Sequence, residues 1–132
     1  MQKISRNKDT GNFLVRYLKS LCHAISGIFY AIKVEHNMII ILLAIIVTTS
    51  AGIYFSIDKY EWLFCIMAFG TVAASELINT AIEASIDLVT TDIKPLAKIA
   101  KDTASSATLI LSITAFIGAI IIFTPYIQNL FI

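Results

Sequence analysis

The sequence predicts an all-α integral membrane protein, with an N-terminal amphipathic surface helix followed by three transmembrane helices. Hydrophobic residues make up 58% of the 132 residues, charged residues make up 14%, and the mean hydropathy is +0.82. A soluble protein of this size could not cover so much apolar surface with so few charges. The length suits one domain, and we expect that domain to span residues 1–132.

Residues 12–33 are the first expected element, an amphipathic helix on the inner leaflet of the membrane. Arg16, Lys19 and His23 lie on one side of this helix, where cations can meet lipid headgroups. A helix that only anchors the protein would show the same pattern, so both roles stay open. The apolar side recurs at helical spacing and comprises Phe13, Leu14, Tyr17, Leu18, Leu21, Ile25, Ile28, Phe29 and Ile32.

Three apolar runs predict transmembrane helices at residues 37–56, 62–88 and 103–125. The first contains 18 residues without a charge, Met38–Phe55, which is about the length that crosses the hydrocarbon core. The second begins at the interfacial residue Trp62, and its uncharged part is so short that the span must continue through Glu76. The third lies in a tail that carries no charge after Asp102.

Two further features of the chain concern processing and redox chemistry. The polar N-terminus is not followed directly by an apolar run, so we expect no cleavable signal peptide. Cys22 and Cys65 lie far apart in different predicted helices, with no CxxC pattern and no histidine pair nearby. Both are therefore expected to be small apolar packing residues.

The basic residues predict the orientation of the three spans. Only Lys59 lies in the loop between the first and second spans. The other nine lie before the first span or between the second and third: Lys3, Arg6, Lys8, Arg16, Lys19, Lys33, Lys94, Lys98 and Lys101. Because cytoplasmic loops carry the excess of Lys and Arg, the N-terminus should be cytoplasmic and the C-terminus outside.

An acidic stripe occupies the cytoplasmic end of the second expected span. Steps of 3, 4 and 4 residues place Glu76, Asn79, Glu83 and Asp87 on one narrow helical face. Ionised groups at membrane depth are costly and need partners or a functional reason. Together with Glu35 these acids would repel one another, and a bound divalent cation would remove the conflict. Oxygen ligands without a histidine pair or thiolate favour a hard ion such as Mg²⁺.

A second cluster, "AKIAKD" at Ala97–Asp102, precedes the third span. Lys98 is well explained by ordinary basic flanking of a span, but Lys101 and Asp102 lie at the membrane boundary beside the acidic stripe. Such a combination is typical of a phosphate-bearing ligand such as Mg·ATP, whose phosphate oxygens a lysine can neutralise. Neither GxxxxGK[ST] nor GxGxxG occurs in the chain.

Two other interpretations of the stripe stay open at this point. In one, Asn79 and the acids form an interhelical hydrogen-bond ladder with basic partners. In the other, the stripe lines a small oligomeric cation conductor that has no enzymatic activity. Spacing alone extends only to a metal site at the inner leaflet, with phosphate as a candidate ligand.

The segments "ELINTAIEASIDL" and "AKIAKD" resemble the signature of the small bacterial integral-membrane lipid kinases, the diacylglycerol kinase and undecaprenol kinase family. The resemblance runs from about Arg16 to the third span and includes the length, the surface helix and the topology. It implies a homotrimeric helix bundle in the bacterial inner membrane, with active sites shared between neighbouring subunits. It also implies an ATP- and Mg²⁺-dependent phosphorylation of a lipid alcohol.

The resemblance implies roles for the acids and for their polar neighbours. Glu76 matches the catalytic base, which takes the proton from the lipid hydroxyl. Glu35 and Glu83 match the metal-coordinating acids, which also place them beside the nucleotide. Asn79 and Asp87 match polar residues of the same site.

The resemblance also indicates where the nucleotide and the lipid lie. Arg16 and His23 correspond to the part of the surface helix that contacts ATP, although an aromatic residue is usual at the position of His23. The other expected nucleotide contacts are Asp92 and Lys94 in the loop, and Lys101 with Asp102. Ser105 stands, with Ser85 and Ser106, where many relatives have valine, alanine or glycine, and these hydroxyls could alter the lipid pocket.

The resemblance is closer to the Gram-positive branch of the family. The segments that indicate this are "EHN" at the first span, "EW" at Glu61–Trp62 and "PLAKIAKD" before the third span. Members of that branch are typically undecaprenol kinases, so the expected product is undecaprenyl phosphate. Diacylglycerol, which would give phosphatidic acid, is the alternative substrate because both lipids present a hydroxyl at the same depth.

Overall fold

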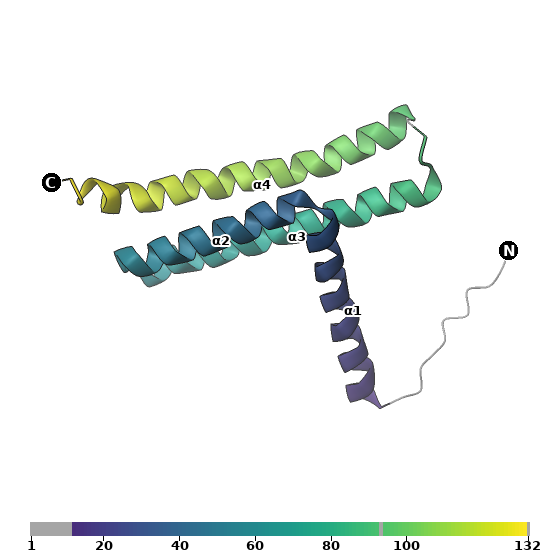
Figure 1. Ribbon diagram of the computed structural model, residues 1–132, viewed down its shortest axis with the longest axis horizontal. Helices are drawn as coiled ribbons and strands as arrows, with labels where there is room; N and C mark the ends of the chain where they lie inside the picture. Colours follow the sequence, from purple (N-terminus) through teal and green to yellow (C-terminus); the bar gives the residue numbers. More distant parts are fainter. Residues whose placement is uncertain (1–11, 93, 132) are drawn as a thin grey trace.

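The computed structural model describes residues 12–92 and 94–131 and consists of helices joined by short turns. α1 (Phe13–Val34) projects from a bundle formed by α2 (His36–Phe55), α3 (Lys59–Val89) and α4 (Pro95–Gln128) (Figure 1). By length and composition, α2, α3 and α4 could each cross a membrane. The all-α class, with one N-terminal helix and three candidate spans, is therefore confirmed. Lys3, Arg6 and Lys8 lie outside the described residues.

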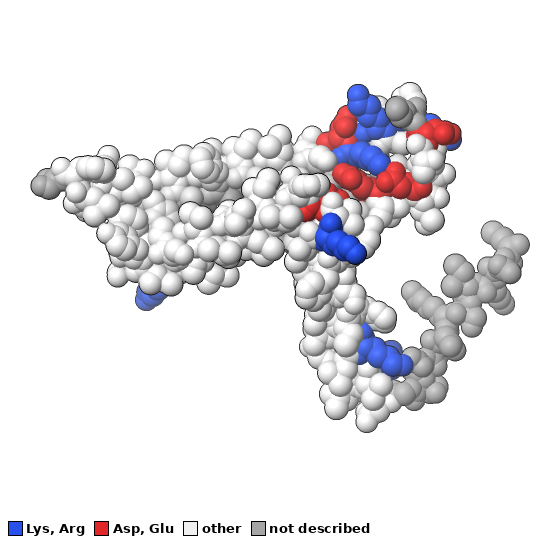
Figure 2. Space-filling view, viewed as in Figure 1, with Lys and Arg blue, Asp and Glu red and all other residues white. Residues whose placement is uncertain are grey.

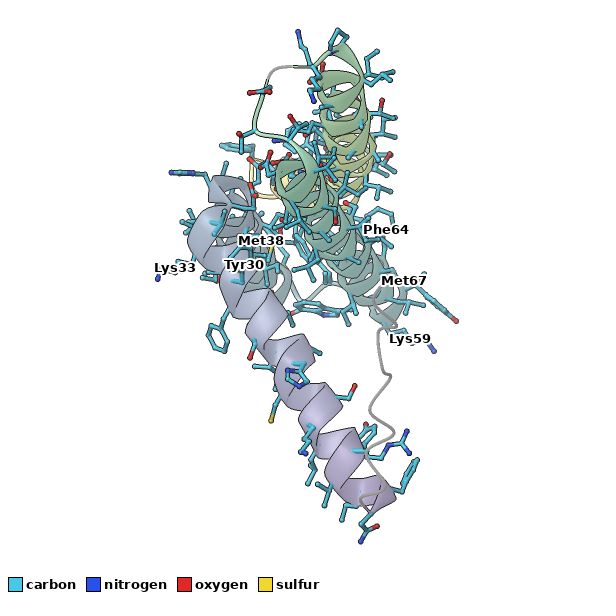
Figure 3. All side chains as sticks on the ribbon, turned by 90° about the vertical axis from the view of Figure 1, so that its right-hand side faces the viewer. Tyr30, Lys33, Met38, Lys59, Phe64 and Met67 are labelled. Atoms are coloured by element: carbon cyan, nitrogen blue, oxygen red, sulfur yellow. The ribbon has the colours of Figure 1, made fainter. Side chains whose placement is uncertain are left out.

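α1 packs against the bundle only near its C-terminal end, where Ala31 is its single buried residue. Side chains project from every side of the rest of the helix (Figure 3). Apolar residues such as Phe13 and Leu14 are largely exposed, as suits a helix whose apolar face lies on a membrane. Cys22 is exposed because it lies on this projecting part, so the packing role expected for it is wrong, whereas Cys65 is buried in α3.

The chain turns sharply at Glu35, between α1 and α2. Glu35 has extended backbone angles, and its N–H donates to the carbonyl of Ala31 at 2.8 Å, which ends α1. Its carbonyl accepts from the N–H of Met38 at 3.2 Å at the start of α2, while its side chain makes no capping bond. The Glu35 carboxylate is therefore free to face the rest of the bundle.

The turn between α2 and α3 is defined by local hydrogen bonds. Ser56 adopts the left-handed conformation with φ 53°, and the N–H of Ile57 donates to the carbonyl of Gly52 at 3.1 Å. Asp58 then caps α3 in a capping box with Glu61, in which each side chain accepts a hydrogen bond from the backbone of the other residue. This end of the bundle carries few charges.

α3 and α4 pack against each other as antiparallel helices along their length. Three contacts fix their register. The hydroxyl of Tyr126 donates to Glu61 Oε2 at 2.7 Å, Lys101 Nζ lies 2.6 Å from Asp87 Oδ1, and between these the Ser105 hydroxyl lies 3.5 Å from Asn79 Oδ1. As the residue numbers in these contacts rise along α3, they fall along α4. The three contacts therefore share one antiparallel register.

α4 begins eight residues before the third span expected at 103–125, and α3 also exceeds the expected 62–88 at both ends. Pro95 starts α4 at the position where a missing N–H costs nothing. Lys98, Lys101 and Asp102 precede the apolar run and so set the point at which the expected span begins. Charged residues outside the membrane do not interrupt a helix, so α4 can start before them. The "AKIAKD" segment is therefore a helical extension of α4.

A tight contact between α3 and α4 predicts that one glycine is sensitive to substitution. A Cβ on Gly118 would overlap the ring of Phe64, whereas a Cβ on Gly70 would have nothing within 4 Å. We expect Gly118→Ala to lower the free energy of unfolding by about 1–3 kcal/mol, because it overpacks a tight contact. Thermal unfolding in detergent micelles, with Gly70→Ala as the matched control, measures the effect. Equal melting temperatures for the two variants would contradict the close packing.

Candidate active site

Glu76 is the most deeply buried side chain of the bundle. It is 0% exposed, and neither carboxylate oxygen has a hydrogen-bond partner in the described part of the chain. It lies within α3, one helical turn from the buried side chains of Asn79 and Thr80. The hydroxyl of Thr80 donates to the backbone carbonyl of Glu76 at 2.9 Å, which leaves the carboxylate unpaired. A buried carboxylate without a partner has room for a donor or a cation from outside the chain.

The structure brings three of the expected acids into one electrostatic group. Burial raises the pKa of the Glu35 carboxyl, and the nearby carboxyls of Glu83 and Glu76 raise this pKa further, whereas His36 lowers it. Asn79 Nδ2 donates to Glu83 Oε1 at 3.0 Å and so holds the half-buried Glu83 on the face that it shares with Glu76. The three acids come from the α1–α2 junction and from two turns of α3.

This group of acids fits a divalent cation only in part. Mutual repulsion of the Glu35, Glu76 and Glu83 carboxyls is the conflict that a cation would relieve. Among the described residues, however, no three His, Cys, Asp or Glu side chains converge closely enough to hold a metal on their own. Mg²⁺ in phosphoryl-transfer sites is commonly held by one or two carboxylates together with substrate phosphates. The donor set is therefore suited to a metal that arrives with a phosphate ligand.

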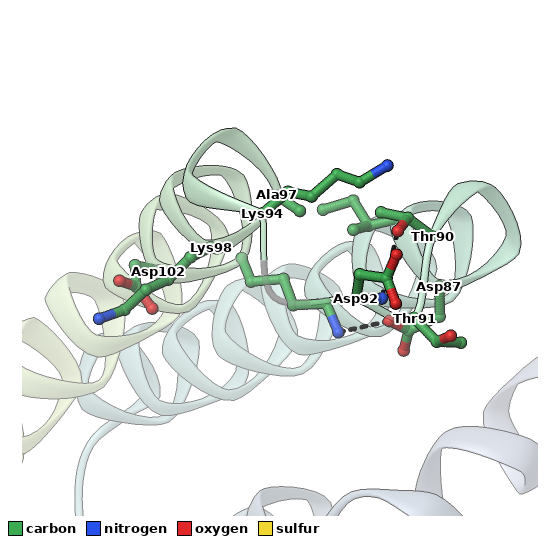
Figure 4. A pocket seen from close by; sticks show the side chains of 10 residues that line it. Asp87, Thr90, Thr91, Asp92, Lys94, Ala97, Lys98 and Asp102 are labelled. Atoms are coloured by element: carbon green, nitrogen blue, oxygen red, sulfur yellow. Dashed lines mark hydrogen bonds and ion pairs between the residues drawn. The ribbon is translucent and has the colours of Figure 1, made fainter.

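A charged cleft of about 210 Å³ lies between the loop ends of α3 and α4 (Figure 4). Charged side chains gather over this end of the bundle, while most of the visible surface of the three long helices is uncharged (Figure 2). The cleft includes five residues of the expected site and Lys98, which the sequence analysis explained as ordinary basic flanking of a span. Its charged lining residues are Asp87, Asp92, Lys94, Lys98, Lys101 and Asp102.

An ion pair spans this cleft. Lys101 Nζ and Asp87 Oδ1 are 2.6 Å apart, and both side chains are partly exposed. Exposed pairs of this kind contribute little to stability, because water and salt screen them. Lys101 can therefore exchange Asp87 for another anion at small cost.

Two expected nucleotide contacts do not reach the cleft. Arg16 and His23 lie on the exposed part of α1, which projects away from the loop ends of α3 and α4 (Figure 1). A single chain in this arrangement does not bring them together with Lys101 or Asp92.

A second cavity, of about 200 Å³, contains Glu76 and Asn79 from α3. Ser105, which the resemblance placed near the lipid, lines it from α4. Sequence reasoning missed three polar lining residues: Asn37 from α2, and Thr108 and Ser112 from α4. Their helical spacing to Ser105 on α4, steps of 3 and 4, was a signal that could have found the last two. Threonine and serine are common in membrane helices, however, and the spacing alone does not show which hydroxyls are buried.

Comparison with known proteins identifies the family. Residues 22–123 match the family described as prokaryotic diacylglycerol kinase. The chain belongs to this family. Its members are kinases of membrane lipids, so the chain is a lipid kinase, and the acidic stripe and the charged cleft lie within the matched residues.

Two named relatives cover nearly the whole chain. The undecaprenol kinase of Bacillus subtilis is 34% identical over 119 residues, which cover 90% of this chain and 97% of the relative. The diacylglycerol kinase of Helicobacter pylori strain J99 is 37% identical over 115 residues, which cover 84% of this chain and 88% of the relative.

A third relative matches a shorter stretch. It is the diacylglycerol kinase of Helicobacter pylori strain 26695, and it is 41% identical over 71 residues, 54% of this chain and 55% of the relative. Membership of a kinase family implies a nucleotide co-substrate. With three candidate spans, it also indicates a multi-pass bacterial membrane protein. The interpretation as a non-enzymatic cation conductor is set aside on the same ground. The contacts of Asp87 with Lys101 and of Asn79 with Ser105 are interhelical contacts of the kind that the hydrogen-bond-ladder interpretation expects.

Proposed function

We propose that this prokaryotic diacylglycerol kinase family member transfers the γ-phosphoryl group of ATP to undecaprenol at the inner leaflet, giving undecaprenyl phosphate and ADP. The observation that carries the proposal is the Glu76 carboxylate, which is fully buried and has no partner among the described residues. Such a group is costly unless a ligand supplies a donor. The hydroxyl of a lipid alcohol is a donor of this kind.

In the proposed reaction the proton of the lipid hydroxyl passes to the Glu76 carboxylate. The alcohol oxygen forms a bond to the γ-phosphorus, and the bond from that phosphorus to the β,γ-bridging oxygen breaks. The lipid leaves as a phosphate monoester and the nucleotide leaves as ADP. Burial of Glu76 serves this role because it keeps water away from the carboxylate and leaves both oxygens open to the lipid hydroxyl.

Glu35 and Glu83 would hold Mg²⁺ together with the phosphates of the nucleotide. When bound, the cation supplies neutralisation of charge on the phosphate oxygens. Asn79 contributes by donating to Glu83 at 3.0 Å, which fixes the direction of one carboxylate oxygen. Glu35 contributes from the α1–α2 turn, where its side chain makes no capping bond.

The charged cleft is the proposed nucleotide site. Lys101 would leave Asp87 and pair with a phosphate, and the other charged residues expected at the nucleotide, Asp92, Lys94 and Asp102, also line the cleft. In the assembled enzyme, which we propose to be a homotrimer, Arg16 and His23 of α1 would reach a nucleotide in a site shared between subunits. This assembly follows from the family resemblance.

Helix lengths support a site at the inner boundary of the membrane. α2 has 20 residues, and at a rise of ~1.5 Å each it is about 30 Å long, the thickness of a hydrocarbon core. Glu76 lies 17 residues after the first residue of α3, which is about 26 Å along the helix. With the turn at Ser56 outside and the N-terminus cytoplasmic, Glu76 and Glu35 both lie near the cytoplasmic boundary.

The choice of undecaprenol is supported by the Bacillus subtilis relative, whose match covers more of both chains than that of either Helicobacter pylori relative. Diacylglycerol is the second candidate, because both Helicobacter pylori relatives are named diacylglycerol kinase.

The substrate is tested with purified protein in mixed micelles containing labelled ATP and Mg²⁺. We expect faster labelling of undecaprenol than of diacylglycerol when the two lipids are offered separately or together. Faster labelling of diacylglycerol would keep the mechanism and reverse the substrate assignment. No label in either lipid, from protein that circular dichroism shows to be helical, would contradict the proposed function.

Glu76→Gln should lower kcat by about 10²–10⁴-fold, because the amide keeps the shape of the side chain and cannot accept the proton. The protein should remain folded, since a neutral amide is cheaper to bury than a carboxylate. The matched control is Glu61→Gln at the opposite end of α3, where glutamine also serves in a capping box. Parental turnover in Glu76→Gln would show that Glu76 is not the base.

Chelation of divalent cations should abolish turnover, and added Mg²⁺ should restore it. Glu83→Gln should raise the Mg²⁺ concentration required for half-maximal rate, because one of the two proposed oxygen ligands loses its charge. Asp58→Asn, at the turn between α2 and α3 and far along α3 from Glu83, is the control. Full turnover in the presence of excess chelator would rule out the metal requirement.

A further inference from the structure

Thr108 is a second buried polar side chain without a partner. It is 7% exposed, and its hydroxyl makes no hydrogen bond within the described residues. Helical serine and threonine hydroxyls usually donate to a carbonyl one turn earlier. On α4, the hydroxyls of Thr103, Ser106 and Thr114 do so at 2.7, 2.7 and 2.9 Å. Thr108 departs from this pattern at the position where α4 faces Glu76.

Thr108 and Glu76 line the same cavity of about 200 Å³. The antiparallel register places them opposite each other, one turn beyond the contact of Ser105 with Asn79. No Lys or Arg of the described chain lines this cavity, so a phosphate would have no cationic partner in it. Two unpaired groups, one a hydroxyl and one a carboxylate, instead suit a small neutral group that both donates and accepts.

The cavity continues into an apolar groove of about 270 Å³. Ile40, Ile41 and Ser112 line both spaces, so the groove begins where the polar cavity ends. Farther along, its lining is almost entirely apolar and includes Phe64 and Val72. A ligand that places a polar head at Glu76 can therefore extend a hydrocarbon chain between α2, α3 and α4.

We propose that the Thr108 hydroxyl binds the hydroxyl of the acceptor lipid and holds it against Glu76. This inference rests on the proposed function. The alcohol donates its proton to Glu76 and accepts a hydrogen bond from Thr108, which uses one of its two oxygen lone pairs. The second lone pair stays free to attack the γ-phosphorus. The hydrocarbon chain of the lipid occupies the apolar groove.

The test is Thr108→Val, which keeps the shape of the side chain and removes the hydroxyl. We expect the KM for undecaprenol to rise about 3- to 10-fold, the usual effect of one neutral hydrogen bond, with the KM for ATP unchanged. Thr108→Ser should recover most of the loss. Thr114→Val is the control, because its hydroxyl is bonded to its own helix and lies outside the cavity.

Thermal unfolding separates a binding role from a structural role and does not depend on turnover. Without lipid, Thr108→Val should melt at or above the parental temperature, because the lost hydroxyl had no partner. The rise in melting temperature that undecaprenol produces should be smaller in the variant than in the parent.

Three results would overturn the inference: a parental KM for lipid together with a parental lipid-induced shift, a lower melting temperature without lipid, or a raised KM for ATP. The first would show that the hydroxyl does not touch the lipid, the second that it is structural, and the third that it serves the nucleotide. If the parent phosphorylates no lipid, the proposed function fails, but the lipid-induced shift still tests the contact with Thr108.

Discussion

The buried carboxylate of Glu76 is the constraint on which the arrangement of this bundle depends. An ionised group taken out of water without a partner costs several kcal/mol, and a membrane-spanning helix offers few ways to offset that cost. Here the cost is reduced locally, because polar side chains line the cavity around Glu76 and their dipoles can orient toward a charge. These side chains are Asn79 from α3 and Ser105, Thr108 and Ser112 from α4. The remaining cost favours any ligand that brings a donor to this position.

The acids around Glu76 determine on which side of it a charged ligand can bind. The Glu35 and Glu83 carboxyls make the electrostatic potential on their side of Glu76 more negative, so a cation, or a phosphate that brings its own cation, is best placed there. The charged cleft lies in that direction, and the apolar groove lies in the other. Glu76 thus stands at the boundary between a surface that suits an aqueous nucleotide and a surface that suits a hydrocarbon chain. A lipid kinase needs a boundary of this kind, because its two substrates come from different solvents.

Much of the fold could be predicted from sequence because membrane insertion depends on long uncharged runs. Helix ends could not be predicted as well: α4 begins at Pro95, eight residues before the expected 103, since charge ends an apolar run without ending a helix. The acidic stripe was found because carboxylates in a span are rare. Thr108 and Ser112 were missed because hydroxyl residues are common there, and only tertiary packing shows that one hydroxyl lacks a partner. Within the described chain Arg16 and His23 lie on the projecting part of α1, away from the charged cleft, and in the proposed homotrimer a neighbouring subunit would complete their site.

The antiparallel register of α3 and α4 determines the order of these features. Asp87 meets Lys101, Asn79 meets Ser105, and farther along Glu61 meets Tyr126. Because the two helices are antiparallel, the interface passes from the ion pair through polar groups to apolar packing, and it ends at the hydrogen bond of Tyr126 with Glu61. On the proposed function, this is also the order of the reacting parts: nucleotide phosphates, lipid hydroxyl, lipid chain. On this proposal the register of α3 and α4 sets the order in which the two substrates meet, while Glu35 and α2 complete the two sites.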